Sequence, residues 1–276
     1  METSTIFTLV TDKAYFYKTK VTINDLRTVG TWSGEIVLIT IDFDLDETYK
    51  QNNNIIEAKF PLIDKTLLLE KIGPNGFANS DKREIHKLNQ WEKLHIFDDY
   101  FAKWTRVVYL DSGLRVLDDV KYLLELDYKD KIVAPNDASP NFNPDQIFKF
   151  QLDWENPELI DLVVNDIANG DGEKMFNSHH MLNCIWVYDT NILKTCNKIQ
   201  LIEAMNKYTL CRTNEMGIMN LLFHFKYNLW KEFPLKNSCG KYLFEWCELN
   251  HSFHTTWRDY CFIKYPISIS LNQTPK

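Results

Sequence analysis

The chain has 276 residues, of which 45% are hydrophobic and 14% aromatic, and it can therefore bury a sizeable core. Its net charge of −7, with no block of Lys and Arg, argues against a general nucleic-acid surface. No apolar run approaches the roughly 18–20 residues that a membrane helix needs. Residues 1–4 lack the basic and apolar regions of a signal peptide. We therefore expect a folded, cytoplasmic protein that binds neither nucleic acid nor membrane.

Short apolar runs bounded by polar residues predict buried strands, and apolar residues at helical spacing predict helices. The elements expected in the first half are a strand and turn over residues 6–15, a strand over 35–41, a surface loop over 51–54, a helix over 65–71, a chain breaker at 73–76, a helix start over 85–91 and a strand over 107–110.

In the second half, an acidic pair at residues 118–119 predicts a helix start, since acidic side chains favour a helix N-terminus. Further elements are expected as a strand over 131–135, an irregular loop over 139–144, a helix over 157–169, a strand over 184–188, and helices over 191–208 and 215–225. This alternation predicts an α/β fold with a mixed, mostly parallel sheet flanked by helices. No repeat or composition change marks a boundary, so we expect a single domain over residues 1–276.

The strand over residues 107–110 ends at Asp111, and two small residues, Ser112 and Gly113, follow it. A carboxylate at the carboxyl end of a strand lies where open α/β sheets bind ligands. Small neighbours let a phosphate, a metal ion or a sugar approach the backbone closely. The structural alternative is that Asp111 only caps the strand end.

Residues 108–116 (VYLDSGLRV) resemble a segment of nucleotide-sugar glycosyltransferases of the GT-A fold, in particular the glycogenin-like, family 8 enzymes. In that family an apolar strand ends in Asp-X-Asp, whereas here Gly113 takes the last acidic position. Other segments resemble the family in the same order along the chain: residues 6–15, 35–41, 85–91, 213–220 (compare D-Q-G-I-L-N) and 254–264 with a late His. The resemblance extends over roughly residues 6–265.

The resemblance implies a Rossmann-like GT-A domain that transfers a hexose from a UDP-sugar to an acceptor hydroxyl with retention of configuration. The residues it makes catalytic are Asp111, Asn183, Asn214 and Glu215. It assigns the uridine to Leu9, Thr11, Asp12 and Tyr15, the phosphate to Lys87, and the ribose and diphosphate or metal to Asp111, Ser112 and Gly113. The sugar and acceptor side is assigned to Asn136, Asp137, Asn183, Asn214 and Glu215.

The resemblance also implies Mn²⁺ or Mg²⁺, held by Asp111 and His254, with His251 as the second candidate for the imidazole. Since Gly113 supplies no carboxylate, the ion would be held weakly, or phosphate oxygens and water would complete its shell. If no metal binds, Lys87 and backbone amides would stabilise the leaving group.

Either Asn177 or Asn183 could match one asparagine of the family pattern. Residues 176–178 (FNS) resemble a motif that immediately precedes a strand, but the expected strand begins only at residue 184, so Asn183 is better placed. The six cysteines include no C-x-x-C pair, which favours free thiols over a zinc site or disulfides.

The expected partners are a UDP-sugar donor and an unknown acceptor, whether glycan, protein or small molecule; a homodimer is left open. A sugar nucleotidyltransferase is one rival, although residues 11–14 contain no glycine for a phosphate loop. The other is a catalytically silent sugar-nucleotide-binding relative, suggested by Gly113. Structural roles also remain open for turn residues Thr11 and Asp12, for Lys87 as a solvated charge, and for Asn214 as a helix cap.

Overall fold

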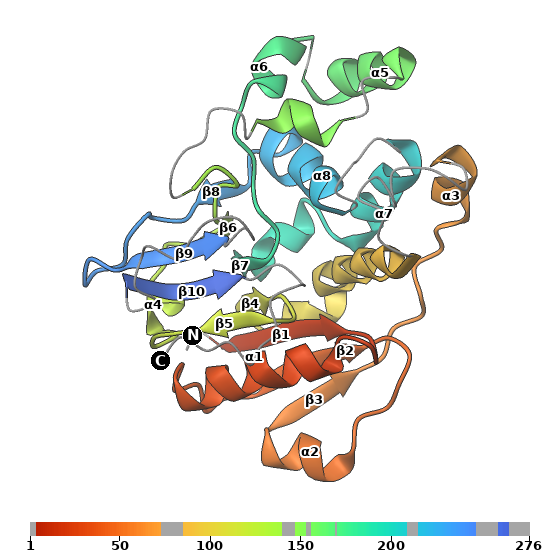
Figure 1. Cartoon of the computed structure of the whole chain (residues 1–276). Helices are drawn as coiled ribbons and strands as arrows, with labels where there is room; N and C mark the ends of the chain where they lie inside the picture. Colours follow the sequence, from red (N-terminus) through yellow and green to blue (C-terminus); the bar gives the residue numbers. More distant parts are fainter. Residues whose placement is uncertain are drawn as a thin grey trace.

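The structure is a computed structural model that describes residues 4–72, 85–139, 147–152, 156–168, 170–208, 215–246 and 259–264. In this part of the chain, a seven-stranded sheet forms the centre of the molecule (Figure 1). Its strands are, in sheet order, β3 (Ile55–Ala58), β2 (Ile36–Thr40), β1 (Thr5–Thr11), β4 (Arg106–Leu110), β7 (Ile185–Asp189), β6 (Ile132–Ala134) and β8 (Trp230–Glu232).

The sheet is mixed but mostly parallel. β1 pairs in parallel with β2 and β4, β2 with β3, and β6 with β8, whereas β7 is antiparallel to both β4 and β6. The carboxyl ends of β1, β2, β4 and β6 therefore meet the amino end of β7 at one edge of the sheet. From β1 the chain adds β2 and β3 on one side and later β4 on the other, so the strand order reverses between β1 and β4. Open α/β sheets bind ligands at such a topological switch point.

Both faces of the sheet are covered near its centre, which explains why every residue of β2 and β7 is buried. Side chains alternate along β4, so Val107 and Tyr109 enter one core and Val108 and Leu110 the other. The first core includes side chains of α5 (Pro157–Ile167), α7 (Lys198–Lys207) and α8 (Glu215–Met219). The second includes α1 (Phe16–Thr28), which lies along the opposite face in Figure 1.

A smaller sheet packs into the second core. Its strand order is β5 (Leu114–Val116), β10 (Tyr260–Lys264) and β9 (Tyr242–Trp246). β10 runs antiparallel to β5, with Lys264 opposite Leu114, and parallel to β9. Because β5 starts directly after the turn that leaves β4, this register brings the end of β10 beside that turn.

The remaining elements connect these layers. The short α-helices are α2 (Glu47–Asn52), α3 (Thr66–Ile72), α4 (Lys121–Leu124) and α6 (Gly172–Phe176). The 3₁₀ helices are Ile85–Phe97, Asp99–Lys103, Phe148–Gln151 and Thr190–Lys194, and a π-helix, Asn220–Lys226, continues α8. None of the described helices is both long and apolar enough to cross a membrane.

The predicted α/β fold is confirmed, with three local corrections. Gln51 and Asn52 end α2 instead of forming a loop, because Asp46 caps that helix by accepting a 2.9 Å hydrogen bond from Tyr49 N. The helix expected at residues 118–119 begins at Lys121. The helix expected over 215–225 becomes π-helical from Asn220. The breaker at 73–76 and most of the loop at 139–144 lie outside the described residues. Among the described cysteines, Cys184, Cys196, Cys239 and Cys261 are free thiols, as predicted.

Candidate active site

Asp111 lies directly after β4, at the switch point between β1 and β4. Leu114 N donates a 3.0 Å hydrogen bond to Asp111 O, which closes a four-residue turn. Gly113, the third residue of that turn, has φ +81°, the left-handed region that type II turns require and that glycine adopts without steric cost. The residue that departs from Asp-X-Asp is therefore the one whose backbone favours glycine.

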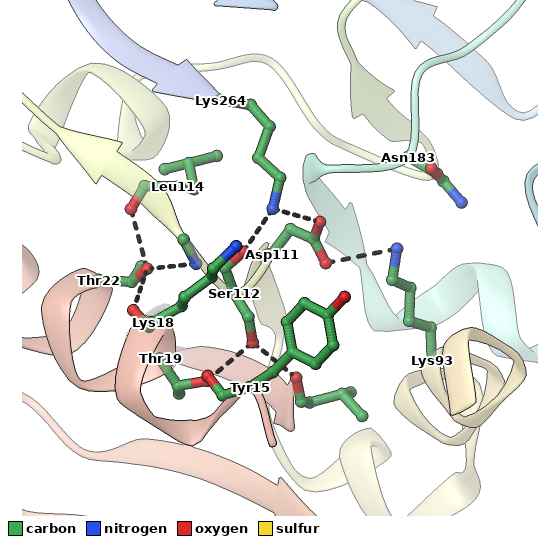
Figure 2. Close-up of polar contacts among 12 residues, drawn as sticks. Tyr15, Lys18, Thr19, Thr22, Lys93, Asp111, Ser112, Leu114, Asn183 and Lys264 are labelled. Carbon is green, nitrogen blue, oxygen red and sulfur yellow. Dashed lines mark hydrogen bonds and ion pairs between the residues drawn. The ribbon is translucent and has the colours of Figure 1, made fainter. Parts of the chain in front are cut away.

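Hydroxyl groups fasten this turn to β1 and α1. Ser112 Oγ donates to Val10 O over 3.0 Å and lies 2.8 Å from Thr19 Oγ1. Thr22 Oγ1 accepts a hydrogen bond from Gly113 N at 3.1 Å and donates one to Leu114 O at 2.9 Å. Figure 2 shows Thr19 and Thr22 reaching from α1 to the two sides of the turn. The turn is consequently held in one conformation.

Two lysines and a tyrosine surround the carboxylate of Asp111. Lys264 Nζ lies 2.7 Å from Asp111 Oδ2 and also donates to Ser112 O. Tyr109 OH donates to Oδ1 over 2.7 Å. Lys93 Nζ lies 3.4 Å from the same oxygen, and Figure 2 shows Lys93 and Lys264 on the two sides of the carboxylate. Burial alone would raise the pKa of Asp111, but the positive charges of Lys264 and Lys93 outweigh it and hold that pKa well below its usual range. Asp111 is therefore a carboxylate at neutral pH.

Lys93 connects Asp111 to a second acidic group. Its Nζ lies 2.9 Å from Oε1 of Glu215, at the start of α8, and Asn183 Nδ2 donates to that oxygen over 2.8 Å. Burial raises the pKa of Glu215, and Lys93 offsets this only in part. Glu215 Oε2 is buried and has no hydrogen-bond partner among the described residues.

The predicted uridine residues lie in the second half of β1 and in the turn that connects it to α1. Asp12 accepts hydrogen bonds from Tyr15 N at 2.8 Å and from Asn89 Nδ2 at 2.9 Å, so each of its carboxylate oxygens has a partner within the protein. Thr11 Oγ1 donates to Asp12 O over 3.0 Å. Tyr15 is half-buried, whereas the side chain of Leu9 lies wholly within the second core. Thr11 and Asp12 thus shape the turn, and the ring of Tyr15 is the partly exposed group.

The predicted acceptor-side residues Asn136 and Asp137 follow β6, at the same edge of the sheet. Asn136 Oδ1 accepts a 3.0 Å hydrogen bond from Ala138 N. Asp137 Oδ2 lies 3.2 Å from Nε2 of the buried His180. Asn136 is itself buried, so Asp137 is the more accessible of the two.

The structure brings together many of the residues predicted for the site: Thr11, Asp12, Tyr15, Asp111, Ser112, Gly113, Asn183 and Glu215. Asn214, His251 and His254 lie outside the described residues. Lys87 belongs to the 3₁₀ helix Ile85–Phe97, but its side chain is also outside them.

Sequence reasoning missed Lys93 and did not single out Lys264 from the late segment in which it lies. Lys93 is one of seven consecutive buried residues, 91–97. Glu92 and His95 beside it are also ionisable, so the local sequence gives no signal that Lys93 is buried.

The described donor groups do not fit a divalent metal ion. Mg²⁺ and similar hard cations need several oxygen ligands, but no group of three or more His, Cys, Asp or Glu side chains among the described residues could hold an ion. Both carboxylate oxygens of Asp111 already contact ammonium or hydroxyl groups, and Gly113 has no side chain that could supply a second carboxylate. This donor set favours an anion next to the lysines.

The seven-stranded, mostly parallel sheet flanked by helices matches the fold of solved glycosyltransferases, and this match confirms the predicted GT-A fold. The chain superimposes on the bifunctional glycosyltransferase WbbM with TM-score 0.58 and 13% identity, over 96% of this chain and 46% of that one. The chain therefore spans less than half the length of WbbM.

Two further solved structures cover most of both chains. The galactosyltransferase LgtC, solved with donor and acceptor sugar analogues, gives TM-score 0.57 and 15% identity over 94% of this chain and 86% of LgtC. Mouse xyloside xylosyltransferase 1 gives TM-score 0.50 and 9% identity, over 93% of this chain and 96% of that one. No protein-family model matches the sequence, and no curated protein matches it either. At these identities the likeness is one of fold.

Proposed function

We propose that the chain is a glycosyltransferase that moves a hexose from a UDP-sugar to an acceptor hydroxyl, with retention of configuration. The observation that carries the proposal is the joint position of Asp111, Lys93 and Glu215 at the ligand-binding edge of a fold shared with sugar transferases. The donor, the acceptor class and the stereochemistry are extended from the family resemblance.

The geometry suggests a role for each part of the site. The ring of Tyr15 stacks on the uracil, and the diphosphate crosses the turn over Ser112 and Gly113. The sugar then lies on the side of the site where Asn183 and Lys93 hold the carboxyl group of Glu215 in place. Asp137 lies on the acceptor side.

The chemical step exchanges one C–O bond for another at the anomeric carbon. The bond from C1 to the β-phosphate oxygen breaks, and UDP leaves with the electron pair. The acceptor oxygen attacks C1 from the same face, and its proton passes to a β-phosphate oxygen, so no protein base is required. Negative charge grows on the phosphate as it leaves, and fixed positive groups stabilise that charge in the transition state. Lys264 is the described lysine that contacts both Asp111 and the turn.

A catalytically silent sugar-nucleotide-binding protein is the second candidate. Two observations favour it. The carboxylate of Asp111 already contacts Tyr109 and Lys264, and Gly113 stands where the family has a second carboxylate. Turnover separates the two functions, whereas nucleotide binding is common to both.

The test begins with a thermal-shift panel of UDP, UDP-glucose, UDP-galactose, GDP and ADP. A ligand at 100 times its Kd stabilises the native state by about 2.7 kcal/mol, so the uridine compounds should raise Tm by several degrees and the others by less. Equal shifts for every nucleotide, or none at saturation, contradict the proposed donor.

Turnover is then measured as UDP release from the UDP-sugar that stabilises most. Wild-type protein should release UDP, and Asp111→Asn should not, with an unchanged circular-dichroism spectrum. Normal turnover by Asp111→Asn would make Asp111 a structural cap. Binding without turnover in wild type, across a panel of acceptors, would favour the silent alternative.

A further inference from the structure

The segment of residues 180–183, just before β7, contacts the candidate site through two of its side chains. Asn183 Nδ2 donates a 2.8 Å hydrogen bond to Glu215 Oε1. His180 Nε2 lies 3.2 Å from Asp137 Oδ2. In Figure 1 the chain reaches this segment from α6 and continues from it into β7. The segment therefore supports two residues predicted for the site, which come from different elements.

The backbone of this segment pairs on one side with the chain that leaves β6. Met181 and Asn136 form an antiparallel bridge, and Leu182 N donates to Pro135 O over 2.8 Å. In a bridge of this kind the hydrogen bonds come from the residues on either side of the opposed pair. The N–H and C=O groups of Met181 itself therefore point away from β6 and need partners on the other side.

The side chain of Asn220 is the partner of both groups. Its Oδ1 accepts a 2.7 Å hydrogen bond from Met181 N, and its Nδ2 donates to Met181 O over 2.9 Å. The same Nδ2 donates to Met216 O, in α8, over 2.9 Å. Asn220 is 0% exposed, and both protons of its amide are used. This one side chain thus fastens the 180–183 segment to the helix that begins with Glu215.

We propose that Asn220 is a positioning residue of the candidate site, which docks residues 180–183 on α8 and thereby holds Asn183 against Glu215 where the donor sugar lies. The inference rests on the proposed function and deepens it. Asn183 and Glu215 belong to separate segments, so the 2.8 Å bond between them depends on how these segments are docked. Asn220 acts through them, because it is too deeply buried to touch a substrate.

The local chemistry supports this role. A buried backbone N–H or C=O without a partner costs free energy, so Met181 stays close to α8 while the amide of Asn220 is present. The helix also changes from α to π at Asn220, and π-helical turns are frequent at functional sites. The alternative is that Asn220 only stabilises the core. Its loss would then lower Tm without changing how the protein binds the sugar.

The experiment is a calorimetric titration of the full chain, without acceptor, with UDP and with UDP-glucose or UDP-galactose, whichever raises Tm more. The ratio of the Kd for the UDP-sugar to the Kd for UDP isolates the contribution of the sugar. Wild type is compared with Asn220→Ser. A serine in a helix can donate to the carbonyl four residues earlier, here Met216 O, so this variant loses specifically the link to Met181.

We expect Asn220→Ser to raise the ratio by about fivefold or more, a change of about 1 kcal/mol, which is typical of one hydrogen bond. The Kd for UDP alone should stay within about twofold of wild type, a difference of under 1 kcal/mol. If Asn220→Ser does not fold, Asn220→Asp repeats the test, since it keeps the shape and the acceptor for Met181 N but lacks both donors.

The matched control is Asp189→Ala. Asp189 is also buried and also binds backbone groups, accepting 2.9 Å hydrogen bonds from Asp130 N and Asn191 N. It lies opposite Arg106, at the other end of β7 from the candidate site. Asp189→Ala should lower Tm but leave the ratio unchanged. A ratio that is equally unchanged in Asn220→Ser would make Asn220 a structural residue and overturn the inference alone.

A double-mutant cycle with Asn183→Ala tests the route of the effect. If Asn220 acts through Asn183, the two substitutions change the ratio by less than the product of their separate effects. Independent effects that multiply fully would show that Asn220 does not act through Asn183, and the inference is wrong while the proposed function stands. Wild-type protein that binds neither UDP nor either UDP-sugar overturns both.

Discussion

The change Lys93→Met tests whether the candidate site is built around a buried charge. Lys93 Nζ lies between Asp111 and Glu215, and its side chain is only 10% exposed. Methionine fills a similar volume but carries no charge. The substitution therefore leaves Glu215, whose side chain is 2% exposed, without an ionic partner, while Asp111 keeps Lys264.

The magnitude follows from this geometry. Removing one partner of a buried ion pair typically lowers the free energy of unfolding by about 3–5 kcal/mol. Because Asp111 retains one lysine, we expect the lower end, about 3 kcal/mol. In a chain of this size each kcal/mol corresponds to roughly 2–4 °C in Tm, so Tm should fall by roughly 6–12 °C.

The pH dependence gives the same prediction a second, independent readout. Burial raises the pKa of Glu215, and loss of Lys93 removes a group that lowers it. In the variant, the folded protein therefore binds a proton at a higher pH than the unfolded chain. An acid of this kind stabilises the fold at low pH and destabilises it as the pH rises through the folded pKa. The deficit relative to wild type should shrink between pH 7 and pH 5.

The assay is thermal and urea unfolding at both pH values. Lys231→Met is the control, since Lys231 and Asp127 form an ion pair with side chains 45% and 77% exposed; it should cost less than about 1 kcal/mol. The double variant Lys93→Met/Glu215→Gln should recover part of the loss, because no buried carboxylate remains unpaired. A loss as small as that of Lys231→Met, or a deficit that grows at low pH, would refute the reasoning.

Two further predictions concern stability elsewhere in the chain. Gly113→Ala should lower the free energy of unfolding by about 1–2 kcal/mol, because Gly113 has φ +81°. Gly113→Asn should lower it by less, since asparagine tolerates this backbone region. Equal effects of the two variants in urea unfolding would contradict the backbone explanation. Burial lowers the pKa of His224 to about 4, so the unfolded chain takes up a proton first and stability should fall as the pH drops from 6.5 to 4, by at most about 3 kcal/mol. His224→Phe should flatten that part of the stability profile, and an unchanged profile would show that other groups cause it.

The sequence was sufficient to predict the parts of the fold that depend on local patterns. The strands β1, β2 and β4 are rich in apolar residues, and the position of Asp111 follows from the end of β4. Asn183 and Glu215, which were predicted for one site from two separate segments, share a 2.8 Å hydrogen bond.

The small sheet could not be predicted in the same way. β5 has only three residues, and its partner β10 lies about 150 residues further along the chain, so no local periodicity identifies the pair. Lys264 was for that reason not recognised as a neighbour of Asp111. Lys93 was missed for another reason. A lysine in a helical segment looks like a solvated charge unless its ion-pair partners are known. The partners of Lys93 are Asp111 and Glu215, which come from distant segments of the chain.

The pairing of β10 with β5 also determines when, during synthesis of the chain, Lys264 can reach the turn after β4. Ser112 and Lys264 are 152 residues apart in sequence. At about 5–20 residues per second, the ribosome needs roughly 8–30 s to add that length of chain. The segments that form β1, β4 and α1 leave the ribosome well before β10. Asp111 therefore spends that interval without Lys264, and the candidate site is complete only when β10 joins the small sheet.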